Sequence, residues 1–168
     1  VITGAGHFLA ETAGFLACEK DISGDLYFTR AGREVAAMYH VTECLASSGF
    51  KIFYEDDFSS RGLIYFFGGY DVLVIAPATA NTVAKCVLGI GDSLAANFFA
   101  QAGKGSVPIL VLPTDSEPDI VSVTPSGKRI KVRPRPLDLA RTEELTRFPG
   151  VTVMRSPEEF WKIFDSLR

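Results

Sequence analysis

The segment that most constrains the fold is residues 72–82, where an apolar run ends in a turn of small polar residues. The run Val72-Leu73-Val74-Ile75-Ala76 predicts a buried strand, and the turn after it contains hydroxyl and amide side chains. In an open parallel sheet, ligands bind in the crevice beyond the carboxyl ends of the strands. The segment therefore predicts a parallel strand followed by a binding site.

The rest of the chain alternates between predicted strands and predicted helices. Strands are predicted at residues 1–3, 26–29, 50–54, 71–76, 107–112 and 151–153. Helices are predicted at residues 7–20, 32–47, 80–88, 92–103 (starting at Asp92 or Ser93), 137–147 and 156–167, and residues 56–62 are a loop or a helix start. A β-hairpin is predicted from residues 120–123 and 129–132. This order predicts an α/β fold: a three-layer, doubly wound parallel sheet with a C-terminal hairpin and helix appendage.

Composition limits the class of protein. The chain has 168 residues, of which 47% are hydrophobic and 22% charged, so we expect one domain over residues 1–168. Its net charge of -3 gives no reason to expect a nucleic-acid partner. The three cysteines are widely spaced and form no C-x-x-C pair, which argues against an iron–sulfur cluster and for a reducing compartment. No apolar run suits a membrane span, no metal-ligand spacing occurs, and we expect a cytoplasmic protein.

Three predicted strand ends carry the same kind of chemistry. The first turn contains Thr3, Gly4, Ala5 and Gly6, and the next strands are followed by Thr29 with Arg30 and by Thr79 with Asn81 and Thr82. Helix-start N–H groups, hydroxyls and one guanidinium together suit a phosphate. Each threonine could equally cap a helix without any ligand, and the first turn alone could be an empty tight turn.

The first turn has only two glycines of a dinucleotide fingerprint, because Leu9 occupies the third position. A pyrophosphate-binding turn requires that third glycine for close packing of the helix on the sheet. No acidic residue follows where the ribose of NAD would be held. These residues favour a mononucleotide over a resident dinucleotide.

The segments 71–85 and 89–94 resemble the signature of the homo-oligomeric flavin-containing cysteine decarboxylase family of FMN proteins, and the likeness runs from residue 1 to about residue 114. The resemblance implies a Rossmann-like or flavodoxin-like fold, bound FMN, and a site completed by a neighbouring subunit in a homo-oligomer built from trimers. By position, it places Gly4, Gly6, Thr29, Thr79 and Thr82 around the phosphate. It further places Pro77, Ala78 and Asn81 near the flavin ring, with Asp92 supporting the turn.

Two branches of that family are disfavoured by departures in the sequence. The phosphopantothenoylcysteine decarboxylases carry a catalytic histidine shortly before the central strand, whereas residues 61–70 contain none. They also carry a cysteine in a substrate flap, and residues 113–118 lack one. The flavin prenyltransferases have a serine-containing first turn and an Arg-Glu-Thr-Pro segment, and this chain has neither.

Residues 2–9, 125–133 and 148–153 resemble instead the archaeoflavoproteins and the bacterial dihydromethanopterin reductases. This resemblance implies an FMN-dependent reductase that passes electrons from NAD(P)H through FMN to a dihydropterin, namely dihydromethanopterin reduced to tetrahydromethanopterin. Relatives with ferredoxin-type cysteine clusters exist, and the lack of such clusters favours a pyridine nucleotide as donor. The open alternatives are an archaeoflavoprotein-type electron carrier reduced by ferredoxin, a decarboxylase-like lyase, and a regulatory binding protein.

Two further features are candidates for a role in that chemistry. His7, at the start of the first helix, could bond the flavin or a substrate or donate a proton, or it could be a capping or surface residue. His40 is expected in the middle of a helix with a structural role. The basic residues around the hairpin could attract the anionic part of NADPH or of a pterin, or they could form a solvated face with Glu143 and Glu144.

Overall fold

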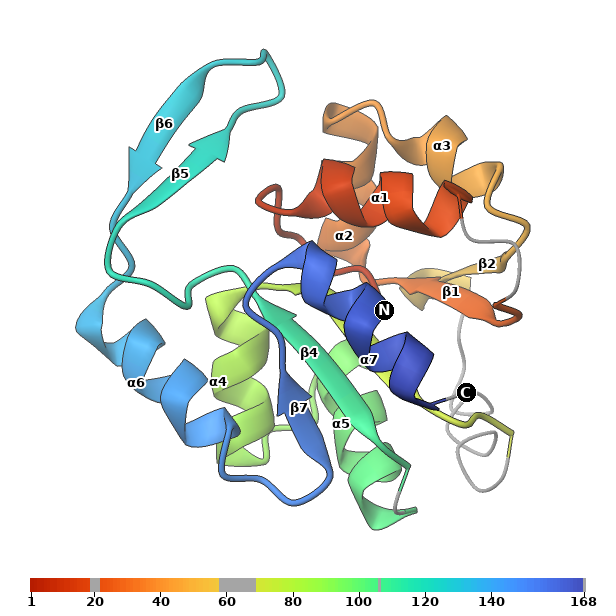
Figure 1. Cartoon of the computed structure of the whole chain (residues 1–168), viewed down its shortest axis with the longest axis vertical. Helices are drawn as coiled ribbons and strands as arrows, with labels where there is room; N and C mark the ends of the chain where they lie inside the picture. Colours follow the sequence, from red (N-terminus) through yellow and green to blue (C-terminus); the bar gives the residue numbers. More distant parts are fainter. Residues whose placement is uncertain (19–21, 58–68, 106, 168) are drawn as a thin grey trace.

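The computed structural model describes residues 1–18, 22–57, 69–105 and 107–167, and its central layer is a parallel sheet (Figure 1). The strands of this layer are β1 (Asp25–Phe28), β2 (Lys51–Tyr54), β3 (Leu73–Ala78), β4 (Ile109–Pro113) and β7 (Val151–Val153). β1 pairs with β2, and β4 pairs with both β3 and β7, in every case in parallel.

Residues 1–3 join these two groups of strands. The Ile2 N–H donates to the Tyr27 carbonyl at 2.8 Å, and the Ala76 N–H donates to the Val1 carbonyl at 3.0 Å. The resulting order is β2, β1, residues 1–3, β3, β4, β7, which is the order of a classic doubly wound nucleotide-binding sheet. The order in which successive strands are added reverses between residues 1–3 and β3, and this switch point is where such sheets bind ligands.

Helices cover both faces of the sheet (Figure 1). Their bounds are α1 (Leu9–Cys18), α2 (Arg30–Met38), α3 (Thr42–Ala46), α4 (Ala80–Leu88), α5 (Leu94–Lys104), α6 (Pro136–Leu145) and α7 (Pro157–Leu167). On one face, Phe98 of α5 and Leu145 of α6 pack with Ile75 of β3. On the other, Phe15 of α1 and Phe160 of α7 pack against the strand residues of β3 and β4. The predicted three-layer α/β fold is confirmed.

The predicted hairpin is also present, as β5 (Ile120–Val123) and β6 (Arg129–Val132) paired antiparallel. Figure 1 shows it extending away from the sheet and its covering helices. A hydrogen bond links the hairpin to the end of α2: the hydroxyl of Tyr39, the C-cap residue, donates to the Val123 carbonyl at 2.8 Å.

Two helix predictions are wrong in detail. The helix predicted over residues 32–47 is split into α2 and α3, because His40 adopts a left-handed φ of 56°. The N–H groups of His40 and Val41 close the end of α2 on the carbonyls of Ala37 and Ala36, the pattern of a Schellman cap. His40 therefore lies between two helices and not within one. A glycine at position 40 would have predicted this cap from the sequence, whereas a histidine does not.

The first helix begins at Leu9 and not at His7. Phe8 has a φ of 66°, so His7 and Phe8 belong to the turn that precedes α1. Helix α5 begins after Ser93, its N-cap, as predicted, and ends slightly later than predicted, at Lys104 with Gly105 as its C-cap. Of the predicted loop at residues 56–62, residues 56 and 57 continue a 3₁₀ turn (Glu55–Asp57), and the rest lies outside the described residues.

The first turn lacks the third glycine that lets a helix pack closely on the sheet, but Gly32 allows α2 to pack closely there. A Cβ added at Gly32 would lie 2.3 Å from the carbonyl oxygen of Ile2, which is backbone and cannot swing away. The absence of a side chain there lets α2 lie directly against the first strand.

We therefore expect the Gly32→Ala variant to lower the free energy of unfolding by about 1–3 kcal/mol, because the added methyl overpacks the contact between α2 and the first strand. Gly14→Ala in α1 is the matched control, since nothing lies within 4 Å of the Cβ it would add. That change should leave stability unchanged or raise it by about 0.5–1 kcal/mol. Urea unfolding followed by circular dichroism measures both, and equal effects of the two variants would contradict the assignment.

Candidate functional site

The Thr3 hydroxyl holds together the two turns that flank the switch point. It donates to the Pro77 carbonyl at 2.7 Å and accepts the Thr79 N–H at 3.1 Å. Thr3 is only 1% exposed, so both bonds are shielded from water. The first turn and the turn after β3 are therefore fixed relative to each other.

A cleft of about 620 Å³ opens at these turns, beyond the carboxyl ends of residues 1–3, β1 and β3. Its lining residues are Thr3, Gly4, Thr29, Arg30, Ala31, Glu34, Glu55, Thr79, Asn81, Thr82, Lys85, Asp92 and Ser93. Its volume lies within the range of about 300–1,000 Å³ that is typical of small-molecule sites.

The structure brings most of the predicted site residues into this one cleft. They are Thr3, Gly4, Thr29, Arg30, Thr79, Asn81, Thr82 and Asp92. Ala5, Gly6 and His7 of the first turn, and Pro77 and Ala78 at the end of β3, are not among the lining residues. The sequence analysis did not name Glu34, Glu55, Lys85 and Ser93 as site residues: Lys85 and Ser93 lie within the family signature, whereas no motif marked Glu34 and Glu55.

Three helices begin at the cleft. The Thr29 hydroxyl caps α2 by accepting the Gly32 N–H at 3.0 Å, and the Thr79 hydroxyl caps α4 by accepting the Thr82 N–H at 3.1 Å. Ser93 caps α5 in the same manner. Helix starts present backbone N–H groups and positive partial charge, which together bind anions. The cleft thus fits a phosphoryl group, and the two threonines also fulfil the capping role that was the alternative to ligand binding.

Gly4 and Gly6 lie in a turn that has no room for side chains. A Cβ at Gly4 would lie 2.6 Å from the Ala31 Cβ, and one at Gly6 would lie 2.1 Å from the Tyr39 hydroxyl oxygen. The first turn is therefore pressed against both ends of α2. This packing brings the backbone of the turn to the edge of the cleft.

The two basic side chains that line the cleft, Arg30 and Lys85, form ion pairs. The Arg30 guanidinium is bound to the Asp56 carboxylate at 2.9 Å, and its side chain is 74% exposed. Lys85 pairs with Asp92 at 2.7 Å, which ties α4 to the turn before α5. Both cations among the residues that line the cleft therefore have an acidic partner, and the role of Arg30 at a phosphate stays a prediction.

His7 is half-buried in the turn before α1, with its ring centroid 3.8 Å from that of Phe8. Desolvation lowers the pKa of His7 below its usual value, and the charges of Glu11 and Asp115 oppose this shift in part. The neutral imidazole is therefore the favoured form near pH 7.

Three arginines among the basic residues around the hairpin have acidic partners. Arg133 pairs with Asp119, Arg135 with Asp138, and Arg141 with Glu144. This favours the interpretation of the run as a solvated face with ion pairs over a patch that attracts anions.

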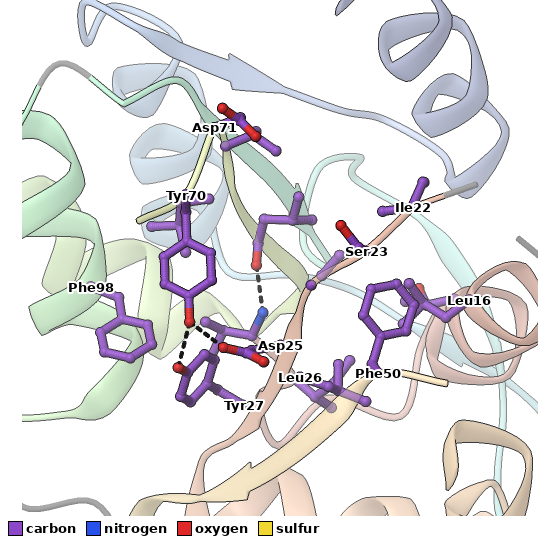
Figure 2. Close-up of a pocket in the computed structure, with 18 of the residues that line it drawn as sticks. Leu16, Ile22, Ser23, Asp25, Leu26, Tyr27, Phe50, Tyr70, Asp71 and Phe98 are labelled. Atoms are coloured by element: carbon purple, nitrogen blue, oxygen red, sulfur yellow. Dashed lines mark hydrogen bonds between the residues drawn. The ribbon is translucent and has the colours of Figure 1, made fainter. Parts of the chain in front are cut away.

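A second cavity of about 620 Å³ lies at the amino ends of the strands, on the opposite edge of the sheet. Figure 2 shows its aromatic wall, in which the Tyr70 hydroxyl donates to the Asp25 carboxylate and lies 2.8 Å from the Tyr27 hydroxyl oxygen. Burial and these bonds raise the pKa of Tyr70. None of the predicted site residues is among the residues described as lining it.

No described helix combines the length and the apolar character needed to cross a bilayer. Within the same residues, no group of three or more His, Cys, Asp or Glu side chains is placed to hold a metal ion.

The role of Thr3 can be tested with a substitution that keeps its shape. Thr3→Val would leave the Pro77 carbonyl and the Thr79 N–H without their buried partner, so we expect the free energy of unfolding to fall by about 1–3 kcal/mol. Thr12→Val is the matched control, because the buried Thr12 hydroxyl has no partner among the described residues. Chemical denaturation should show that variant to be at least as stable as the parent, and a stable Thr3→Val protein would refute the role of Thr3.

The lowered pKa of His7 predicts a pH dependence of stability. The unfolded chain takes up this proton near pH 6.5, whereas the folded chain takes it up only at lower pH. Stability contributed by neutral His7 is therefore complete above about pH 6.5 and is lost as pH falls through the folded pKa. The His7→Gln variant should lose less stability than the parent between pH 7.5 and pH 5. Identical pH profiles for the two proteins would contradict this assignment, and imidazole NMR titration checks the pKa directly.

Comparison with known proteins identifies relatives along nearly the whole chain. A Methanocaldococcus jannaschii protein named dihydromethanopterin reductase (acceptor) is 31% identical, over 98% of this chain and 94% of that protein. Its namesake from Methanosarcina mazei is 38% identical over 74% of this chain, which spans 57% of that protein's length. Among solved structures, Burkholderia xenovorans DmrB in complex with FMN, described as a cubic protein cage for redox transfer, is 34% identical. It has a TM-score of 0.83, and the match covers 98% of this chain and 90% of DmrB.

The chain also matches a protein family over most of its length. The model of the family described as Flavoprotein matches residues 25–166, which include all three helix starts at the cleft. The chain therefore belongs to the Flavoprotein family, as its central motif predicts.

Proposed function

We propose that this protein is an FMN-dependent reductase and that the cleft at the switch point binds the phosphate end of FMN. The observation that carries the proposal is the meeting of the first turn with the starts of α2, α4 and α5 in one cleft, fixed by the Thr3 hydroxyl. Membership of the Flavoprotein family and the likeness to an FMN-bound structure support it.

In this proposal the phosphate lies at the start of α4. The Thr79 and Thr82 hydroxyl oxygens are 2.9 Å apart there, and the N-terminal N–H groups of α4 carry the positive end of the helix dipole. Gly4 and Thr29 complete the phosphate site from the neighbouring turns. The flavin ring is proposed to lie by Pro77, Ala78 and Asn81, with Asp92 and Lys85 supporting the turn through their ion pair.

Bound FMN would accept electrons from a donor and pass them to an acceptor. The names of the relatives support dihydromethanopterin as the acceptor, which takes up two electrons and two protons to become tetrahydromethanopterin. His7 is proposed to lie near the exchange and to hold or donate a proton there, because its lowered pKa makes the imidazolium, once formed, a stronger acid than an exposed histidine. NAD(P)H is proposed as donor.

We also propose a homo-oligomer built from trimers. Several large apolar side chains are exposed on the single chain, among them Met38, Leu88 and Leu137, each more than half exposed. DmrB is described as a cubic cage, which supports an assembly of many copies.

The rival function is a one-electron carrier reduced by ferredoxin. The description of DmrB as a cage for redox transfer is also compatible with this function, so the experiment must separate the two. A single experiment separates the two. The purified protein, loaded with FMN, is mixed anaerobically with NADPH, with NADH or with reduced ferredoxin, and the flavin absorbance near 450 nm is followed.

We expect bleaching by a pyridine nucleotide and recovery of the absorbance on addition of dihydromethanopterin, with tetrahydromethanopterin formed. Rapid bleaching by ferredoxin alone would transfer the assignment to the electron carrier. A protein that takes up no FMN would refute both. Size-exclusion chromatography with light scattering on the same sample tests whether the mass is a multiple of three chains.

A further inference from the structure

The Glu55 carboxylate bridges the starts of two helices at the cleft. Glu55 follows β2 directly, in the short 3₁₀ turn Glu55–Asp57. One oxygen, Oε2, accepts the Arg30 N–H of α2 at 2.8 Å, and the other, Oε1, accepts the Leu94 N–H of α5 at 2.8 Å. Glu55 also lines the cleft. A carboxylate thus occupies the position that an anionic ligand could take at these two helices.

The three helix starts at the cleft therefore differ in whether their positive charge is still available to an anionic ligand. The first turns of α2 and α5 contain no acidic residue of their own, and Glu55 supplies the negative charge to both. The first turn of α4 consists of Ala80, Asn81 and Thr82, which carry no charge. The positive end of one helix dipole remains open to an anion, while the other two are already neutralised.

The other charges of the cleft do not offset this arrangement. Arg30 is paired with Asp56, and Lys85 is paired with Asp92. A second phosphoryl group near α2 and α5 would meet the Glu55 carboxylate, and it would have to displace this carboxylate from two charge-assisted hydrogen bonds.

We propose that Glu55 is a specificity-determining residue that limits the cleft to one phosphoryl group, so that the protein selects FMN over flavins with a pyrophosphate, such as FAD. This inference rests on the proposed function as a flavoprotein. It assigns to Glu55 a role that the motifs of the chain do not reveal, because the residue acts from the turn after β2 on two helices distant in sequence.

The test measures the dissociation constants of FMN, FAD and riboflavin for the flavin-free full-length protein, by quenching of flavin fluorescence. In the Glu55→Gln variant one amide oxygen remains to accept a hydrogen bond, while the NH₂ group faces the second helix N–H. We expect the ratio of the FAD constant to the FMN constant to fall about tenfold in this variant, because one helix start becomes available to a second phosphate.

Glu34→Gln is the matched control. Glu34 lines the same cleft, so its substitution removes the same charge, but the N–H groups of Arg30 and Leu94 are bound to Glu55 and remain so. The ratio should stay at the parent value in this variant. An unchanged ratio in Glu55→Gln, or an equal fall in both variants, would overturn the proposal.

A second measurement needs no variant. In NMR spectra of the parent protein, FMN should shift the backbone amide signals of Ala80 and Asn81 strongly and those of Arg30 and Leu94 weakly, since Glu55 keeps its two bonds. Large shifts at Arg30 and Leu94 would show that the phosphate displaces Glu55 and would overturn the inference.

The outcomes also separate this inference from the proposed function. Failure of the parent protein to bind any of the three flavins would refute the flavoprotein proposal itself. Equal binding of FMN and FAD by the parent would leave that proposal standing and would overturn the role of Glu55.

Discussion

The pair of hydrogen bonds made by the Thr3 hydroxyl is the interaction on which the rest of the site depends. It joins the end of the first strand to the end of β3 across the switch point, where the strand order reverses. Parallel strands diverge into separate crossover connections at this point: ladder hydrogen bonds such as that from the Ala76 N–H to the Val1 carbonyl pair the strands, and the Thr3 hydroxyl links the turns that follow them. Because Thr3 is buried, the bonds are made in a low-dielectric environment and losing one partner is costly. The position of α4 relative to the first turn follows from this link.

Once the turns are fixed, the electrostatics of the cleft is decided by which helix starts are already satisfied. Helix N-termini are general anion sites, and three of them meet here. A side chain of the protein satisfies two of them, through Glu55, and the ion pairs of Arg30 and Lys85 keep the nearby cations occupied. A site that attracted anions at every helix start would bind phosphates indiscriminately. In our proposal, the Glu55 carboxylate limits where a phosphate binds and how many phosphates the cleft accepts.

Several features could be predicted because they depend on local chemistry. The apolar run of β3 and the turn after it identify a buried parallel strand and a polar edge, and the threonine caps of α2 and α4 follow from residue type at a helix start. Other features could not. The break between α2 and α3 uses His40 in a conformation that glycine usually signals, and the pairing of Arg30 with Asp56 was not predicted. Glu55 carries no motif, because its two partners are separated from it by 25 and 39 residues.

The sequence by itself determined the alternation of strands and helices, the glycine and threonine chemistry of the turns, and through its central motif the Flavoprotein family. These are properties of short segments, in which periodicity and residue type act over a few neighbours. The tertiary structure alone decided which turns meet, which charges are already paired, and which of three equivalent helix starts stays open. The physical reason is that hydrogen bonds and ion pairs are formed between groups that are close in space, and the sheet order brings together residues that the chain keeps far apart.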